Sequence, residues 1–330
     1  MTTTPVDLDI RIPTDNRAQA LRADVRAGLT GSPKSLPPKW FYDAHGSDLF
    51  DAITELDEYY PTRTERQLIV EHADDIAALT GTATLIELGS GSSDKTRRLI
   101  DAMSTHRDDG SGLQHYAPLD VSPSALRGAV GRLRAEYPGL RVDGIVADFT
   151  GTLAPLPGPG PRTVAFLGGT IGNLEPTARK RFLTNVSAAL EPGEHFLLGA
   201  GLVADETAMQ RAYDDASGVT AAFNRNVLTV VNRELGADFD VDSYRHVAVW
   251  NADDEWIEMR LRATHDARVH IPGADLAVDV AADEEILTEI SAKFRPDTLS
   301  AELAAVGLPV QQLWTDPADR FAIFLSSKRL

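Results

Sequence analysis

Two glycines and two aspartates follow or close apolar segments in the middle of the chain, and their types suit a small polar ligand. Gly89 and Gly91 come directly after the apolar segment "TLIEL". Asp120 closes the segment "QHYAPLD", and Asp148 closes "RVDGIVAD" just before Phe149. Glycines let a backbone approach a ligand closely, and carboxylates accept hydrogen bonds from hydroxyl and amino groups. Together they predict a site for a molecule that carries hydroxyls and an amine.

The segments that carry these residues alternate with helical patterns. We expect strands at 84–88, 114–120, 141–148, 163–169 and 195–200, and helices at 93–104, 123–136 and 176–190. This alternation predicts a doubly wound α/β sheet, whose parallel strands carry helices on both faces. Ligands of open α/β sheets bind beyond the carboxyl ends of the strands, where Gly89, Asp120 and Asp148 are expected to lie.

The surroundings of the glycine turn favour an adenosine group without phosphates. The turn lacks a third glycine, since Asp94 stands in its place, and it does not match a phosphate-binding loop. Asp120 is suited to accept both ribose hydroxyls, and Asp148 to accept from the adenine amine while the next backbone amide contacts the ring. S-adenosylmethionine fits this description. A nicotinamide dinucleotide is the main alternative, and an ordinary turn with helix caps is the simplest one.

Composition excludes several classes of function. The 330 residues include no cysteine, so disulfides, thiolate metal sites and cysteine nucleophiles are absent. The net charge of −17 disfavours nucleic acid and anionic membranes as partners. The eight histidines are scattered without metal-ligand spacing, so no metal is expected. With no run of about 18 apolar residues and no secretory pattern, we expect a cytoplasmic protein.

The rest of the chain predicts a second lobe. Two helices are expected over 205–235, antiparallel strands over 239–280, and a terminal hairpin over 308–328 that rejoins the sheet; 107–112 and 155–161 are expected to be loops. We therefore predict a doubly wound domain at 63–202 and 293–330. An α+β substrate-binding lobe would comprise 15–62 and 203–292. Asp214 and Asp215 are expected on a solvated helix face.

Five longer stretches carry a specific resemblance. The segments 32–65, 87–96 ("ELGSGSSDKT"), 166–174 ("FLGGTIGNL"), 211–240 and 287–296 ("LTEISAKFRP") resemble the actinobacterial histidine N-alpha-methyltransferase family of ergothioneine biosynthesis. The resemblance runs from about residue 17 to the end. It implies a Rossmann-like class I methyltransferase that moves three methyl groups from S-adenosylmethionine to the α-amine of L-histidine. The products would be hercynine and S-adenosyl-L-homocysteine.

The resemblance also implies roles for individual residues. S-adenosylmethionine would be held by Gly89, Lys95, Asp120, Asp148 and Phe149, beside the Gly91 turn. The substrate's α-carboxylate and amine would be held by Asn173 and Tyr213, its imidazole by Tyr59, Glu289 and Ser291, and the methyl-accepting end would be lined by Tyr42 and Phe50. No obligatory catalytic base is expected. Gly169 and Gly201 depart from the family pattern, where a serine and an acidic residue are expected.

Simple physical arguments bear on the substrate residues. Glu289 and Ser291 are two apart on an extended segment, so they face the same way and suit the two nitrogens of one imidazole. Without the resemblance, both belong to a solvated strand face, and Asn173 is a helix cap. The aromatic cluster at 40–60 would partly surround a cationic methylated amine, with Trp40 and Phe41 in the core.

Three alternatives remain open. The methyl acceptor could be another amino acid or amine, such as an indole amino acid, although Glu289 with Ser291 favours imidazole. The protein could be a dinucleotide-dependent dehydrogenase, or a non-catalytic partner that binds S-adenosylmethionine as a regulator. We expect a monomer whose partner is a small molecule.

Overall fold

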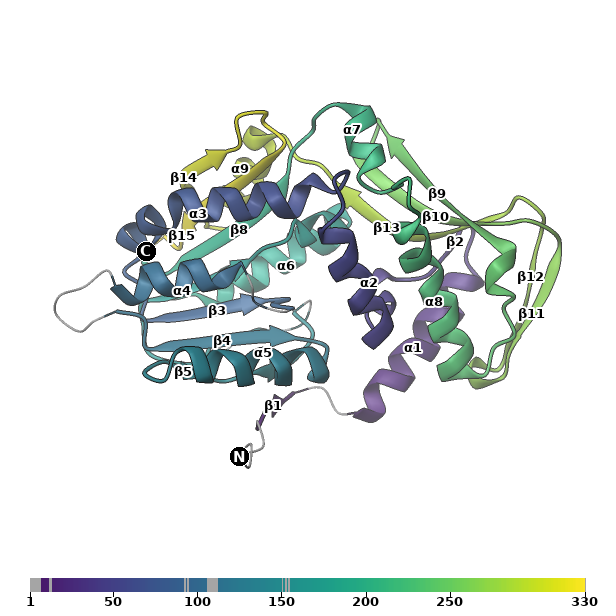
Figure 1. The fold of residues 1–330 in the computed structure, drawn as a ribbon, viewed down its shortest axis with the longest axis horizontal. Helices are drawn as coiled ribbons and strands as arrows, with labels where there is room; N and C mark the ends of the chain where they lie inside the picture. Colours follow the sequence, from purple (N-terminus) through teal and green to yellow (C-terminus); the bar gives the residue numbers. More distant parts are fainter. Residues whose placement is uncertain are drawn as a thin grey trace. The chain divides into compact units, whose positions relative to one another are not determined.

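The structure is a computed structural model that describes residues 7–11, 14–91, 93, 95–105, 112–149, 151, 153 and 155–329. The chain divides into two compact units. Unit 1 consists of Met1–Ile12, Pro61–Val203 and Phe294–Leu330, and unit 2 of Pro13–Tyr60 and Ala204–Lys293. Each unit contains a sheet (Figure 1). Asp94 and the expected loop residues 107–111 lie outside the described residues.

The sheet of unit 1 is mainly parallel, and the predicted doubly wound α/β fold is confirmed. Its strands are β1 (Asp9–Ile10), β3 (Thr84–Leu88), β4 (His115–Asp120), β5 (Arg141–Val142), β6 (Ile145–Val146), β7 (Arg162–Phe166), β8 (His195–Gly201), β14 (Val310–Thr315) and β15 (Phe321–Ser327). The order is β1-β6-β4-β3-β7-β8-β15-β14, with β5 beside β4. Neighbours from β1 across to β8 are parallel, and β15 is antiparallel to β8 and β14. The terminal hairpin therefore rejoins the sheet as expected.

Helices cover both faces of this sheet. They are α3 (Tyr60–Thr80), α4 (Thr96–Thr105), α5 (Pro123–Glu136), α6 (Pro176–Ala189) and α9 (Pro296–Ala305). Residues of α3, α4 and α5 share a buried cluster with Leu85 of β3 and Ala165 of β7. The next residue of β7, Phe166, faces the other way and meets Phe182 of α6, with ring centroids 4.6 Å apart. The sheet is therefore buried on both sides, as parallel sheets require.

Three of the predicted element boundaries are wrong. The helix expected from residue 93 begins at Thr96, because Ser93 has a left-handed backbone with φ of 57°. The strand expected over 141–148 is interrupted, and its pieces are β5 and β6. The strand expected over 163–169 ends at Phe166, because Gly168 and Gly169 both turn the chain with positive φ. β1 and α3 are not among the predicted elements.

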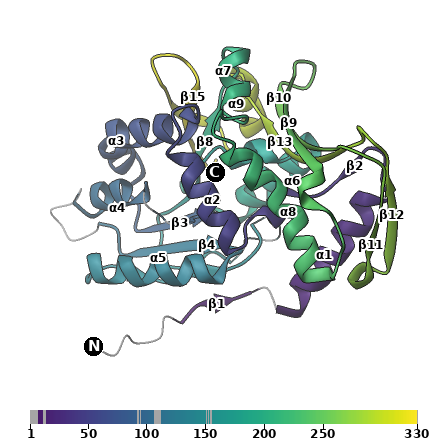
Figure 2. The same cartoon turned by 45° about the vertical axis from the view of Figure 1, so that its right-hand side comes forward.

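Unit 2 is an α+β assembly with a small sheet of its own. Its helices are α1 (Thr14–Leu29), η1 (Pro38–Phe41), α2 (Ala44–Thr54), α7 (Glu206–Arg211), α8 (Val219–Leu235) and η3 (Val241–Ser243). The sheet has the order β2 (Lys34–Ser35), β13 (Glu285–Ala292), β10 (Trp256–Ala263) and β9 (Tyr244–Asn251). A separate hairpin joins β11 (Ala267–Ile271) through η4 (Pro272–Ala274) to β12 (Leu276–Val280). Figure 2 shows this hairpin next to α1, whose Arg26 donates to the Asp275 carbonyl at 2.8 Å.

The helix α8 is central to unit 2, and its start explains one wrong expectation. Asp215 does not lie on a solvated face. Its buried carboxylate accepts the backbone N–H groups of Val219 at 3.0 Å and Thr220 at 2.7 Å. Burial opposes the charged form, but these hydrogen bonds and one from Ser217 hold the pKa of Asp215 well below its usual value. The carboxylate therefore stabilises the first turn of α8.

Candidate cofactor and substrate sites

The glycine turn after β3 is tied to the end of β4. Gly89 has a φ of 68°, a conformation that favours glycine, and its N–H donates to the Leu119 carbonyl at 2.8 Å. The Gly91 N–H donates to the Asp120 carboxylate at 3.1 Å. A Cβ placed on Gly89 would lie 3.7 Å from the ring of Phe149. Three segments that are distant in sequence thus meet at the carboxyl ends of the strands.

Asp120 keeps acceptor capacity for a ligand. One carboxylate oxygen accepts from Gly91 and the other accepts from the Ser122 N–H at 2.9 Å. Each oxygen has a further lone pair, so two adjacent hydroxyls can still donate to this carboxylate. Burial raises the pKa of Asp120, although these backbone hydrogen bonds oppose the rise. Asp148 lies two residues beyond β6, and the Ala147 N–H before it donates to the Asp120 carbonyl at 3.2 Å.

Lys95, which follows the glycine turn, is held by the carboxylate of Glu65, a residue that the sequence analysis did not predict. Glu65 of α3 is fully buried, and one of its oxygens lies 2.5 Å from the Lys95 ammonium. Its second oxygen accepts the Gly168 N–H at 2.6 Å. A Cβ on Gly199 would lie 2.1 Å from Glu65, so glycine there leaves room for the carboxylate. Glu65 therefore fixes Lys95 between β3 and β7, the point where the strand order reverses.

A second buried carboxylate lies beneath the glycine turn. Glu87 of β3 accepts from the Thr96 hydroxyl at 2.7 Å and from the Tyr116 hydroxyl, which also contacts the Ser93 hydroxyl at 2.9 Å. Burial raises the pKa of Glu87 to about 7, while hydrogen bonds from Tyr116 and Thr96 oppose the rise. This network ties Ser93 and the start of α4 to β3.

Asn173 and the two residues that depart from the family pattern, Gly169 and Gly201, lie near the ends of β7 and β8. Asn173 ends the short helix η2 (Thr170–Asn173), while the N-cap of α6 is Glu175, so the helix-cap alternative for Asn173 is wrong. Gly169 has a φ of 69°, which disfavours the serine that the family pattern leads one to expect. Gly201 ends β8 and its carbonyl accepts the Phe294 N–H at 2.9 Å. Asn173 belongs to unit 1, and its contact with substrate stays a prediction.

The predicted aromatic residues of unit 2 form a continuous series of ring contacts. Ring centroids are 5.6 Å apart for Tyr42 and Phe50, 6.3 Å for Phe50 and Tyr59, and 6.0 Å for Tyr59 and Tyr213. Phe223 of α8 packs against the first two rings. Each contact is edge-to-face or tilted, a favoured geometry for aromatic pairs. Trp40 and Phe41 are buried, as expected.

Tyr213 and Ser291 are in direct contact, and they share a partner that was not predicted. The Tyr213 and Ser291 hydroxyls are 2.7 Å apart, and the Lys293 ammonium donates to each at 2.8 Å. Burial lowers the pKa of Lys293 to about 8, while Tyr60 and Glu289 oppose the shift. Burial, followed by the charge of Glu289, raises the pKa of Tyr213. The alternation of Glu289 and Ser291 continues to residue 293, a signal that could have identified the lysine.

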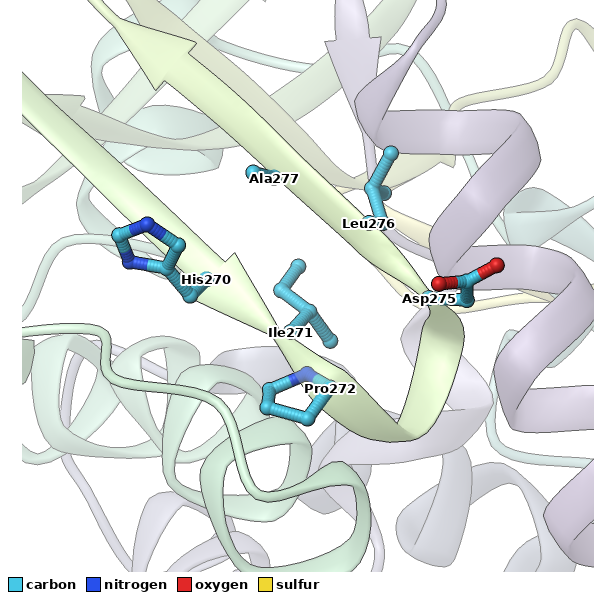
Figure 3. Close-up of a pocket in the computed structure, with 6 residues that line it drawn as sticks. All are labelled: His270, Ile271, Pro272, Asp275, Leu276 and Ala277. Carbon is cyan, nitrogen blue, oxygen red and sulfur yellow. The ribbon is translucent and has the colours of Figure 1, made fainter.

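Binding of a metal ion or a membrane would need a group of ligating side chains or a long apolar helix. In the described ranges, no three His, Asp or Glu side chains are grouped as metal ligands. None of the helices placed in the structure has the length and apolarity needed to cross a membrane. A hollow on the β11–β12 hairpin is lined by His270, Ile271, Pro272, Asp275, Leu276 and Ala277 (Figure 3). It contains none of the predicted site residues.

The fold and the polar groups at the carboxyl ends of β3, β4 and β7 are those of a doubly wound protein that binds a nucleoside-type cofactor. The sequence defines the class further. Residues 21–328 match the model of the family described as "Histidine-specific methyltransferase, SAM-dependent", and the chain belongs to this family.

Curated relatives agree with this family. The chain is 55% identical to a histidine N-alpha-methyltransferase of Mycolicibacterium smegmatis over 94% of its length and 96% of that protein. It is 50% identical to a protein of the same name from Mycobacterium tuberculosis, over 94% of this chain and 95% of that one. It is also 25% identical to "Ergothioneine biosynthesis protein 1" of Neurospora crassa, over 91% of this chain and 35% of that protein.

Proposed function

We propose that this protein transfers methyl groups from S-adenosylmethionine to the α-amine of L-histidine. The observation that carries the proposal is the identity of 55% and 50% to two histidine N-alpha-methyltransferases, each over 94% of the chain. Three successive transfers would give hercynine, which fits the relative named for ergothioneine biosynthesis. The family's dependence on S-adenosylmethionine supports the cofactor.

The cofactor would be held by unit 1. Asp120 would accept the two ribose hydroxyls with the lone pairs that its backbone partners leave unused. Asp148 and Phe149 would hold the adenine, and Gly89 and Gly91 would admit the ligand close to the backbone. Lys95 would position the end of the cofactor nearest the switch point of the sheet, held there by Glu65.

The residues proposed to bind the imidazole and to line the methyl-accepting end belong to unit 2. Glu289 would accept an imidazole N–H, beside Tyr59 and Ser291. Tyr42 and Phe50 would line the methyl-accepting end, where aromatic faces stabilise a growing cationic head by about 0.5–2 kcal/mol per ring. Their contact with one another and with Phe223 supports such a cluster.

Methyl transfer to the amine depends more on the alignment of the reacting atoms than on a strong general base. The neutral amine donates its electron pair to the methyl carbon as the carbon–sulfur bond breaks, and the sulfonium leaves as the neutral thioether of S-adenosyl-L-homocysteine. In-line placement at about 3 Å supplies much of the rate enhancement in such reactions. Each new ammonium then loses a proton to water before the next transfer, until no N–H remains.

A panel of acceptors tests this function. The purified protein is incubated with S-adenosylmethionine and histidine, tryptophan, tyrosine or histamine, and successive methyl mass increments are followed. We expect mono-, di- and trimethylated histidine and slower turnover of the other acceptors. Faster methylation of tryptophan would favour the indole alternative. Tight binding of S-adenosyl-L-homocysteine without turnover of any panel member would favour a non-catalytic binder.

We also propose that the protein acts as a cytoplasmic monomer, without nucleic acid or membrane as a partner. The net charge of −17 supports the absence of nucleic acid and membrane partners, because it repels phosphate groups. Light scattering behind size-exclusion chromatography measures the mass in solution. A dimer mass at assay concentration contradicts the proposal.

A further inference from the structure

The roles proposed above leave Lys293 without a function, although it is buried against two predicted substrate residues. Its side chain follows β13, and the residue is 6% exposed. The ammonium donates to the hydroxyls of Tyr213 and Ser291, and it also lies 4.7 Å from the centre of the Tyr213 ring. The two hydroxyls contact each other at 2.7 Å. These three side chains, which we call the lysine cluster, all belong to unit 2.

The hydrogens of the lysine cluster limit what it can offer a ligand. An ammonium donates three hydrogen bonds and accepts none. The contact between Tyr213 and Ser291 uses one hydroxyl hydrogen, and neither hydroxyl can donate to a charged Lys293. The other hydroxyl hydrogen must therefore find an acceptor outside the cluster, whichever hydroxyl carries it. The third N–H of Lys293 likewise has no acceptor among the described residues.

The charge of the lysine cluster is not cancelled by a contacting carboxylate. Within the described part of the chain, the hydrogen-bond acceptors of Lys293 are hydroxyl oxygens. Glu289 and Tyr60 act on the ammonium through electrostatics and favour its charged form. The cluster therefore combines a positive charge with one ammonium hydrogen and one hydroxyl hydrogen that the contacts within it leave unused.

We propose that Lys293 is a specificity-determining residue that binds the α-carboxylate of the amino-acid substrate, together with the outward hydroxyl of the Tyr213–Ser291 pair. This inference rests on the proposed function, which supplies an α-amino acid as the acceptor. A carboxylate is negatively charged and only accepts hydrogen bonds, so it matches two donors beside a cation. A neutral imidazole nitrogen gains little from the charge, and a protonated imidazole is repelled.

Binding of amino acids and of their decarboxylated amines tests the inference. Dissociation constants of histidine and histamine, and of tryptophan and tryptamine, are measured by calorimetry with saturating S-adenosyl-L-homocysteine. Lys293→Met removes the charge and keeps an unbranched side chain of similar length. We expect Lys293→Met to weaken binding of the amino acid by about 10- to 100-fold, the range of a charged hydrogen bond. Binding of the amine should change by less than about threefold.

The design separates this inference from the proposed function. If the wild-type protein binds tryptophan and not histidine, the proposed acceptor is wrong, and the tryptophan–tryptamine pair then tests Lys293. Lys293→Arg keeps the charge and should retain most of the preference for the amino acid. The exposed Lys39→Met, in the same unit, should behave as wild type. Equal losses for amino acid and amine in a folded Lys293→Met, or no loss for either, would overturn the inference.

Discussion

The ion pair between buried Glu65 and partly exposed Lys95 gives the sharpest prediction for unit 1. Glu65 receives two donors, the Lys95 ammonium at 2.5 Å and the Gly168 N–H at 2.6 Å. In Glu65→Gln the side chain keeps its shape but has only one oxygen. Whichever way the amide turns, its NH2 group faces one of the two donors, so one contact is lost.

The size of the effect follows from burial. Glu65 has no exposed side-chain surface, whereas Lys95 is 21% exposed and can recover some hydration when its partner is lost. Loss of one charge-assisted hydrogen bond costs about 1.5–3 kcal/mol, and the hydration of Lys95 keeps the total within that range. In a unit of this size each kcal/mol lowers the melting temperature by about 2–4 °C, so we expect a drop of roughly 3–12 °C.

The assay is thermal melting followed by circular dichroism, with and without S-adenosyl-L-homocysteine. Because Lys95 loses its anchor, calorimetry should show weaker binding of this compound, by about three- to tenfold, equivalent to about 0.7–1.4 kcal/mol. The matched control is Glu71→Gln, an exposed residue on the same helix whose partner is Gln67. A Glu65→Gln protein that melts within about 1 °C of wild type and binds the compound equally well would refute the reasoning.

Three further predictions concern single features of the two units. Gly169→Ser should lower the unfolding free energy by about 1–2 kcal/mol, measured by urea titration, because the φ of 69° strains any side chain. The pKa of Glu87 is raised from 4.5 to about 7, so its contribution to stability is lost as the pH rises from about 4.5 to 7. Between pH 4.5 and 7, the unfolding free energy of Glu87→Gln should therefore fall less steeply with pH than that of the wild type. The same slope in both proteins would contradict the argument that burial raises the pKa of Glu87. Replacing Tyr42 and Phe50 together by leucine should make mono- and dimethylated histidine accumulate in the mass spectrum, whereas undiminished trimethylated product would exclude an aromatic role in the third transfer.

Local sequence patterns were sufficient to predict most strands of the unit 1 sheet and several of the residues that meet at its edge. Apolar runs such as 84–88 are buried strands, and in a parallel sheet the residues after each strand meet at one edge. That is why Gly91 and Asp120, which are 29 positions apart, share a hydrogen bond. The position of each glycine and aspartate directly after an apolar segment is therefore enough to predict that they meet, without reference to side-chain packing.

The residues that were missed depend on tertiary contacts. Nothing local to Glu65 indicates that its carboxylate meets Lys95, 30 residues later, and Gly168, 103 residues later. Aspartate is a residue type that usually lies at the surface. Asp215 instead lies just before α8, where its carboxylate accepts the N–H of Thr220. Lys293 could have been found, because it continues the two-residue period of β13.

Lys95 and Lys293 differ in a way that can be measured. Lys95 contacts a carboxylate that cancels its charge, whereas Lys293 contacts hydroxyls, and burial lowers its pKa to about 8 despite Glu289 and Tyr60. A bound carboxylate favours the charged form of a lysine, so substrate binding should raise the pKa of Lys293. Near pH 8.5, histidine binding should therefore be accompanied by proton uptake in the wild-type protein. Calorimetry in buffers of different ionisation enthalpy should show less uptake in Lys293→Met, since the substrate's own amine titrates in both proteins. Equal proton exchange in the two would mean that the Lys293 ammonium does not meet the carboxylate.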